Sequence, residues 1–504
     1  MKNRTIPINR GKVLGGSSAL NLLVWNRAAA PEYDAWEAVG NHGWNWKSMH
    51  RAMKRSENFT GPTNAAHGYS GPVHAVVNRY IPQHQEFFIP TVSTLGIPIN
   101  EESLGGDAIG VMYQPSSIDP THYNRSYSAN AYIPLAGANL DVLTDTRVLK
   151  INFHKTGRSK EPRAIGVILE TGESILAHRE VILSAGAVQS PGLLELSGIG
   201  QQDVLSAANI STLIDLPGVG ENLQDHIRVQ LSYQLKDNYT SYDILKYDSA
   251  VTQAELVKWF NGDLSWFDYT GSGFIITDWK KVVGNDSKLI SLAKAAFGSS
   301  SNVHDKEKLA FLENPAVPQL EVIFSDGYTG LKGYPAPGTS LFGKGFFTLI
   351  AVLLHPFSRG SVHINPADKL GKPLLNPNYL SNEYDVQSFV ESLKFCRKVA
   401  LTEPLRSAWV SEYEPGLENV QSDEQWRDFA LNTTFSIQHP MSTCAMGARD
   451  SGGVVDARLK VYGTANLRVV DASVIPLQIS GHIQTAVYGI AERAAEMIID
   501  DARK

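Results

Sequence analysis

Residues 181–192 read Val-Ile-Leu-Ser-Ala-Gly-Ala-Val-Gln-Ser-Pro-Gly, and this stretch decides the fold. Its first three residues predict a short buried strand. The small residues Ser184, Ala185 and Gly186 predict a turn, and a helix is expected at Leu193–Ser197. Nucleotide-binding α/β folds present backbone amides to a ligand through such a strand, turn and helix. The stretch therefore predicts part of a nucleotide-binding domain.

Strand patterns continue on both sides of this stretch. Leu467–Asp471 predicts a second buried strand, and Asp471 with Ala472 stands at its carboxyl end, where α/β folds place ligands. Residues 230–345 show no motif and are expected to cover the site. Further strands are expected at 140–143, 148–153, 164–169, 318–324 and 347–354, and helices at 384–401 and 485–500.

Residues 11–21 form a glycine-rich segment that runs into apolar sequence. Gly15 and Gly16 would let the backbone approach a ligand closely. Ser17 and Ser18 would cap a following helix, whose N-terminal amides favour phosphate. An ordinary glycine turn before a helix is the commoner explanation of such a pattern.

Two histidines stand in turn-rich segments near the C-terminus. His439 lies in Gln-His-Pro-Met-Ser-Thr (438–443), and His482 lies in Ser-Gly-His-Ile-Gln-Thr (480–485). Histidine is the side chain best placed to take a proton from an alcohol near neutral pH, and the accompanying hydride needs an organic cofactor. A metal site is disfavoured because no histidine pair has i, i+4 spacing, and a hydrolase is disfavoured because no Gly-x-Ser-x-Gly turn occurs.

The length of 504 residues favours two interleaved domains, and the composition is that of a globular protein. A net charge of −6 gives no reason to expect a nucleic-acid partner, and no apolar run has transmembrane length. Two cysteines exclude a disulfide framework. Seven Asn-x-Ser/Thr sequons occur, about twice the random number, which mildly favours secretion, although chance explains them about as well.

Taken in order, the motifs resemble those of the glucose–methanol–choline (GMC) oxidoreductases, flavoenzymes that oxidise alcohols. The segment from Arg10 to Asn21, with Arg27, resembles the first signature of the family, and residues 186–200 resemble the second. Residues 218–226, 355–362, 376–380 and the two histidine segments complete the match. Among members of the family, the chain looks most like an aryl-alcohol oxidase or dehydrogenase.

The resemblance implies an α/β (α+β) two-domain protein. An incomplete Rossmann-like FAD-binding domain would be interleaved with a substrate domain built on an antiparallel sheet. The FAD-binding domain would comprise residues 1–60, 125–228 and 436–504, and the substrate-binding domain would comprise residues 61–124 and 229–435.

FAD is the cofactor that the resemblance implies. His439 would be the catalytic base and His482 its partner, with Gln438 as the candidate substrate-binding residue. Leu20 stands where some members tether FAD through a histidine, so we expect the flavin to be bound non-covalently. The residues expected along FAD are Gly15, Gly16, Ser17, Ser18, Asn21, Val148, Ala185, Gly186, Asp471, Ala472 and Thr485.

The implied reaction converts an alcohol into a carbonyl compound. The substrate hydroxyl would lie between His439 and His482, and His439 would take its proton as hydride leaves for the flavin. A small-molecule alcohol is therefore the expected partner. Oxygen or a quinone-type acceptor would then reoxidise the flavin, and the sequence does not choose between them.

The chain departs from the family at its start. No Gly-x-Gly-x-x-Gly occurs, and the first signature already begins at Arg10. We expect the opening βαβ unit to be absent, FAD affinity to be lowered and a sheet edge to lie open. We expect the chain to be either an incomplete gene model or a shortened homologue. Secretion would then depend on a signal peptide upstream.

Two other functions remain open alongside alcohol oxidation. Some family members use the scaffold for cyclisation or lyase chemistry, with the flavin in a structural role. A non-catalytic remnant is the other alternative. Ser442 is a smaller departure, because the family usually has glycine there.

Overall fold

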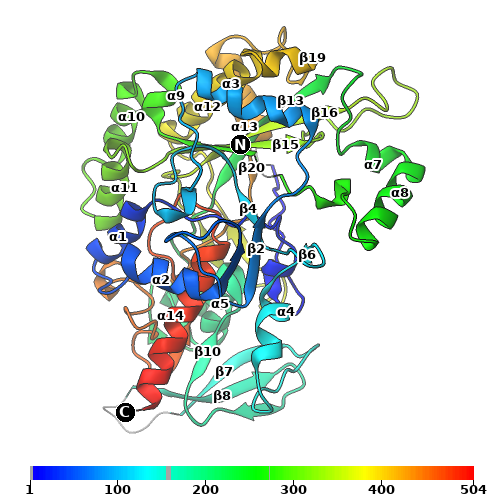
Figure 1. The fold of residues 1–504 in the computed structure, drawn as a ribbon. Coiled ribbons are helices and arrows are strands. Elements are labelled where there is room, and N and C mark those ends of the chain that lie inside the picture. The colour runs from blue at the N-terminus through cyan, green and yellow to red at the C-terminus, as the bar shows by residue number, and fades with distance from the viewer. Residues whose placement is uncertain (1–3, 155–160, 272, 504) are drawn as a thin grey trace.

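The computed structural model describes residues 4–154, 161–271 and 273–503. A seven-stranded antiparallel sheet dominates the upper part of the molecule in Figure 1, with strand order β19-β13-β16-β15-β14-β3 and β20 paired to β13. Its strands are β3 (Gly110–Tyr113), β13 (Ile227–Leu235), β14 (Gly273–Thr277), β15 (Leu320–Asp326), β16 (Phe346–Leu353), β19 (Trp409–Glu414) and β20 (Phe435–Ser436).

This sheet is buried on both faces. Because side chains alternate along a strand, Leu349 and Leu353 of β16 point to one face and Ile350 and Val352 to the other. The first face packs in the same core as α12 (Glu383–Leu401). The second face, with Phe274 of β14, packs against Val24 from the N-terminal part of the chain. The second face is therefore the one turned toward the first signature.

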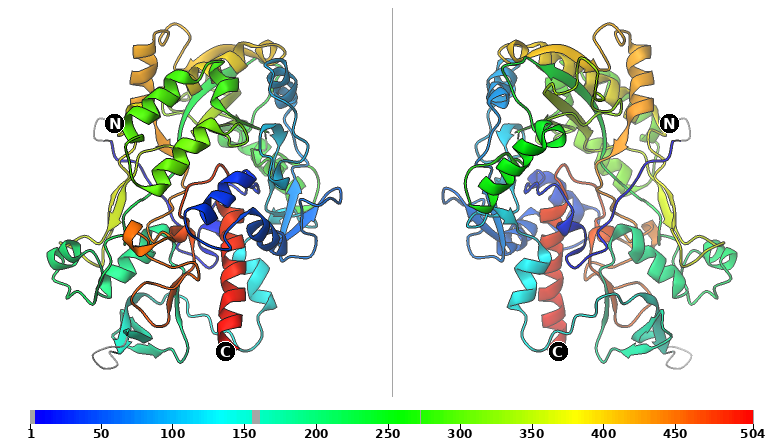
Figure 2. Two further views of the ribbon diagram at one scale, coloured as in Figure 1. Left: turned by 90° about the vertical axis from the view of Figure 1, so that its left-hand side faces the viewer. Right: turned by 90° about the vertical axis from the view of Figure 1, so that its right-hand side faces the viewer.

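A second layer lies below the sheet in Figure 1 and contains the elements expected to bind nucleotide. Strands β10 (Val181–Leu183) and β21 (Leu467–Val469) pair in parallel, and α5 (Gly186–Leu196) follows β10. Strands β7 (Val148–His154), β8 (Arg163–Leu169) and β9 (Ser174–Leu176) form an antiparallel sheet. Figure 2 shows the C-terminal helix α14 (Gln484–Ala502) running down this layer, packed against α2 (Trp46–Ser56).

Further helices and strands complete the described fold. The remaining helices are α1 (Ala30–Ala38), α3 (Phe88–Thr94), α4 (Ser128–Tyr132), α6 (Gln202–Ala207), α7 (Ile244–Tyr247), α8 (Ser249–Phe260), α9 (Trp279–Val283), α10 (Ser287–Phe297), α11 (Val303–Glu313) and α13 (Asp423–Thr433). The remaining strands are β1 (Glu57–Thr60), β2 (Val73–Val77), β4 (Pro115–Ser116), β5 (Ile118–Asp119), β6 (Asn124–Arg125), β11 (Ile199–Gly200), β12 (Ile214–Asp215), β17 (Ser361–His363) and β18 (Leu374–Asn376). In the described ranges, no helix is long and apolar enough to cross a bilayer.

The expected two-domain α/β architecture is confirmed, as are most of the expected strands and helices. The strand expected at 140–143 is absent. Leu140, Val142 and Leu143 are each more than two-fifths exposed, so no neighbouring strand buries them. The segment 230–345 also contains regular helices and strands, although its sequence contains no recognisable motif. The domain bounds stay a prediction.

Two expected helix starts are wrong. The helix expected from Leu193 begins seven residues earlier, at Gly186, despite Pro191 in its interior. Proline cannot donate to the carbonyl four residues before it, and here the Thr443 hydroxyl donates to that carbonyl, Ala187 O, at 2.7 Å. Ser17 and Ser18 cap no α-helix, because they lie inside a single 3-10 turn, Gly16–Ala19.

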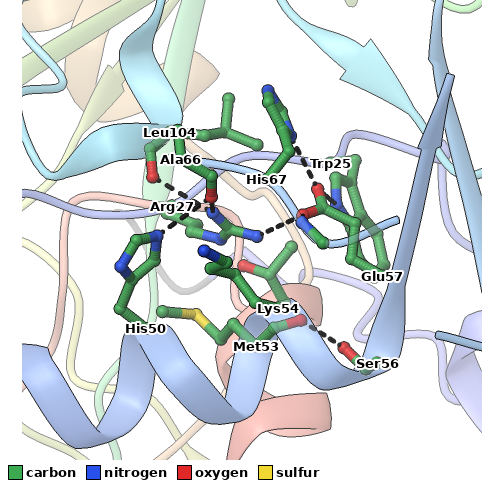
Figure 3. A network of polar contacts seen from close by, with 12 residues as sticks. Trp25, Arg27, His50, Met53, Lys54, Ser56, Glu57, Ala66, His67 and Leu104 are labelled. Atoms are coloured by element: carbon green, nitrogen blue, oxygen red, sulfur yellow. Dashed lines mark hydrogen bonds and ion pairs between the residues drawn. The ribbon is translucent and has the colours of Figure 1, made fainter. Parts of the chain in front are cut away.

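A buried ion pair anchors the segment that follows the first signature. Arg27 and Glu57 lie 2.7 Å apart, and neither side chain is exposed. Figure 3 shows how Arg27 also donates to the carbonyls of Ala66 and Leu104, while Glu57 accepts from Trp25 Nε1. Burial by itself would raise the pKa of Glu57, but the Arg27 cation and neighbouring donors lower it to about 2. Glu57 therefore stays ionised and holds Arg27 in place.

Replacing Arg27 should destabilise the protein strongly. In Arg27→Met the Glu57 carboxylate stays buried without its cation, so the free energy of unfolding should fall by roughly 3–5 kcal/mol. Arg51→Met is the matched control, because Arg51 is 64% exposed in its ion pair with Glu496 and should change the free energy by less than about 1 kcal/mol. Urea denaturation measures both, and equal losses for the two variants would contradict this account.

Candidate functional site

The two C-terminal histidines lie against each other. His439 follows β20 in a loop under the large sheet, and His482 precedes α14. Their ring centroids are 4.7 Å apart and the ring planes meet at 75°. Both side chains are partly exposed. The fold thus brings together two imidazoles from different segments, as the sequence predicts.

Three consecutive residues, Gln224, Asp225 and His226, hold the loop that carries His439. Gln224 pairs through its backbone with Met441, and its side-chain amide donates to Ser442 Oγ at 2.9 Å. Asp225 accepts the backbone N–H of His439 at 2.9 Å. His226 Nδ1 lies 2.9 Å from His439 Nδ1. We call residues 224–226 the clamp.

The clamp also touches the segment that leads to His482. Gln224 Oε1 accepts the backbone N–H of Gln478 at 3.3 Å, and His226 Nε2 lies 2.9 Å from the carbonyl of Ile479. All three clamp side chains are buried. One rigid segment therefore fixes both histidine-bearing loops relative to each other.

His482 is held separately by an acidic residue of the sheet. Its Nε2 lies 2.9 Å from Glu321 Oε1 on β15, and its backbone N–H donates to Asn26 Oδ1 at 2.9 Å. The ring of Phe274 on β14 meets the His482 ring edge-on, with centroids 5.9 Å apart. Because a carboxylate accepts, Nε2 of His482 carries a proton. The nitrogen left to face a small molecule is then Nδ1.

Burial controls the charge of the site. It lowers the pKa of His439 well below 6.5, and the electrostatic influence of His482, His226 and Arg10 lowers it further. The pKa of His226 is lowered in the same way, first by burial and then by His482 and His355. His439 and His226 are therefore neutral at neutral pH. Burial also raises the pKa of Asp225 to about 6, although Ser436, Tyr379 and His439 donate to it.

The loop around His439 has two non-glycine residues in the left-handed region, Gln438 at φ 72° and Ser442 at φ 74°. Such conformations are held only where the surroundings impose them, often at functional sites. Gln438 Oε1 accepts from Asn9 N at 2.6 Å and Nε2 donates to Pro7 O at 2.9 Å. Both polar ends of Gln438 are thus used within the chain, and substrate binding by Gln438 would need these bonds to break.

The expected FAD residues fall into two groups. The first group surrounds the first signature: Ser18 Oγ donates to Gly15 O at 2.6 Å, and Asn21 contacts Gln484, next to Thr485. The Thr485 hydroxyl donates to the carbonyl of Asn26. Gly16 and Ser17 lie in the same 3-10 turn. Asn26 links this group to His482.

The second group lies at the start of α5. Asp471 Oδ2 accepts from Gly186 N at 2.9 Å and from Ser190 Oγ at 2.5 Å, and Ala185 N donates to the same hydroxyl. The carbonyl of Ala472 accepts from Ser442 N, which joins this group to the His439 loop. Val148 begins β7, a strand that packs against α5. The Ala185 and Gly186 amides both have partners within the chain.

The residues present fit FAD on two observations. Gly16 (φ 55°) and Gly186 (φ 81°) have open space where a side chain would begin, so a ligand can lie directly against their backbone. The Asn26 side-chain nitrogen is buried beside His482 without a hydrogen-bond partner in the described chain. A buried donor of this kind calls for an acceptor from a bound molecule.

Two residues of the site were not assigned a role from the sequence. His226 ends the motif at residues 218–226, and that motif was the available signal. Glu321 lies inside an apolar strand pattern, where one acidic residue among Leu320, Val322 and Ile323 is unusual. Its partner His482 is far away in sequence, so only the fold reveals the pair.

Comparisons with known proteins agree with this arrangement. Models of the GMC oxidoreductase family match residues 1–228 and 356–491. The GMC oxidoreductase family protein Mala s 12 of Malassezia sympodialis is 35% identical, with 99% of this chain and 81% of the relative covered.

Solved structures of similar proteins have the same fold. An FAD-dependent oxidoreductase from Chaetomium thermophilum has a TM-score of 0.88 at 26% identity, covering 99% of this chain and 88% of that one. A fungal aryl-alcohol oxidase has a TM-score of 0.84 at 28% identity, covering 100% and 88%. The chain belongs to the GMC oxidoreductase family.

Proposed function

We propose that the protein is an FAD-dependent oxidoreductase that oxidises the CH–OH group of a small alcohol to a carbonyl. The observation that carries the proposal is the contact between His439 and His482, with ring centroids 4.7 Å apart. His439 is neutral and partly exposed, so it can accept a proton from a bound hydroxyl. The family membership supports an oxidoreductase acting on such donors.

His439 and His482 have different roles in this proposal. His439 takes the hydroxyl proton, and His482 orients the hydroxyl through Nδ1. Glu321 keeps the His482 ring in position through Nε2. Phe274 and the other apolar side chains on this face of the sheet exclude water from the site. Positioning of this kind and general-base catalysis each lower the barrier.

FAD, when bound, would accept the hydride that leaves the alcohol carbon. Gly16 and Gly186 would hold it by close backbone contact, and Asn26 would donate a hydrogen bond to it. Leu20 is 59% exposed and has no group that bonds covalently to flavin, which supports non-covalent binding. The electron acceptor in our proposal is oxygen or a quinone-type compound.

A side chain at Gly186 should weaken FAD binding. In Gly186→Ala the new methyl group fills the open space beside the backbone, and the dissociation constant of FAD should rise at least ~10-fold, equivalent to about 1.4 kcal/mol. Gly172→Ala is a matched control, because Gly172 has a similar φ of 86° and equally open surroundings in a hairpin turn. Flavin fluorescence titration measures both. Equal weakening in the two variants would show that backbone strain, not the site, is responsible.

Removing the base should slow oxidation without preventing FAD binding. We expect His439→Ala to lower the rate at which benzyl alcohol bleaches bound flavin by roughly 10²–10⁴-fold. His42→Ala, at an exposed position, is the control and should react at the wild-type rate. Anaerobic stopped-flow absorbance gives both rates. Wild-type protein that binds FAD but is bleached by no alcohol would contradict the proposal and favour a non-redox relative.

The pH dependence should reflect the lowered pKa of His439. A base acts only in its neutral form, so activity is present above that pKa and is lost as the pH falls through it. Because the pKa lies well below 6.5, the acid limb of kcat/KM should lie below pH 6.5. His482→Gln removes one of the neighbours that lower the pKa of His439 and should move the limb upward. A wild-type limb at or above pH 6.5 would contradict the lowered pKa of His439.

A further inference from the structure

We infer that His226 is a positioning residue that sets the tautomer of His439, so that the bare nitrogen of His439 is Nε2. The inference rests on the proposed function, in which His439 is the base. It adds His226, which was not among the predicted site residues, and it identifies Nε2 of His439 as the atom that receives the substrate proton. Three groups in a row carry the argument: the carbonyl of Ile479, His226 and His439. We call them the hydrogen-bond chain.

The Ile479 carbonyl fixes the proton of His226. A carbonyl oxygen only accepts, so the 2.9 Å contact between His226 Nε2 and Ile479 O requires a proton on Nε2. His226 is 1% exposed, and its pKa is lowered well below 6.5, first by burial and then by the influence of His482, His355 and Lys308. The ring is therefore neutral and carries one proton only. Its Nδ1 is left as a lone-pair acceptor.

His226 in turn fixes the proton of His439. The two Nδ1 atoms lie 2.9 Å apart, and one of them must donate. Since Nδ1 of His226 has no proton, Nδ1 of His439 donates. His439 is neutral for the same reason as His226, and its single proton is then used in this bond. Within the described residues, its Nε2 has no hydrogen-bond partner. The lone pair of His439 Nε2 is thus free to accept a substrate proton.

Backbone contacts also hold the hydrogen-bond chain in place. The backbone N–H of Ile437 donates to the His226 carbonyl at 2.9 Å, and Asp225 accepts the backbone N–H of His439. These bonds fix the backbones that carry the two rings, and rotation of the His226 ring would break its contacts with His439 and Ile479. The titratable groups that influence the pKa of His226 are His482, His355 and Lys308, and each of them lowers it. The Ile479 carbonyl raises this pKa, but burial and these three groups outweigh it.

The test reads the tautomer directly and then perturbs it. The full chain, labelled with nitrogen-15 histidine and loaded with FAD, is studied by NMR near neutral pH. The shift of a ring nitrogen distinguishes a protonated from a bare atom, and the His439 signals are assigned by their loss in His439→Asn. We expect Nδ1 protonated and Nε2 bare. A protonated Nε2 overturns the inference, whatever the activity of the protein.

Two substitutions of His226 separate tautomer control from simple packing. His226→Asn places an amide oxygen near the position of Nδ1 and should keep Nδ1–H on His439. His226→Gln keeps a donor toward Ile479 but leaves His439 without an acceptor, so Nε2–H should appear in its spectrum. Circular dichroism and melting temperature identify any variant that fails to fold. In that case the wild-type spectrum alone decides.

Activity provides the second readout. If the inference holds, His226→Gln lowers kcat by at least ~10-fold relative to His226→Asn. KM should change little, because His439 Nε2 no longer has a free lone pair to accept the proton, whereas substrate binding is not affected. Equal losses in both variants, in step with stability, overturn it. A bare Nε2 in a protein that oxidises no alcohol leaves the tautomer assignment standing and refutes only the proposed function.

Discussion

Three consecutive side chains, Gln224, Asp225 and His226, hold the two histidine-bearing segments in contact. They bond to Ser442 and His439 on one loop and to Gln478 and Ile479 on the other. Buried polar groups must find partners, and here the partners belong to loops more than two hundred residues away in the sequence. The position of the candidate site is therefore set by the hydrogen bonds that the buried side chains of the clamp make to the two loops.

The same segment determines how the site behaves as an acid and a base. Water is excluded around the clamp, so imidazoles resist protonation and the Asp225 carboxyl resists ionisation. Glu321, also buried, accepts from His482 on the other side. The site thus combines a neutral base with a histidine beside a carboxylate. His439 and His482 differ in this way because the His439 ring contacts His226, whereas the His482 ring contacts the carboxylate of Glu321.

Sequence reasoning succeeded where local patterns are strong. The strand at β10, the helix at α12 and the neighbouring positions of His439 and His482 follow from apolar spacing and motif order. It failed where tertiary contacts override local signals. The local pattern predicts a helix only from Leu193, but Thr443 satisfies the carbonyl that Pro191 leaves free, and the helix begins at Gly186. Residues 140–143 have strand character but no strand to pair with. His226 and Glu321 could not be assigned because their roles depend on partners distant in sequence.

The central claim is that His439 presents a bare Nε2 at the meeting point of the two loops. Neutron diffraction from crystals exchanged into heavy water near neutral pH tests it most directly, because deuterium on each ring nitrogen becomes visible. The account predicts deuterium on His226 Nε2 and His439 Nδ1 and none on His439 Nε2. Deuterium on His439 Nε2, or a His226 ring whose Nε2 carries none, would contradict it.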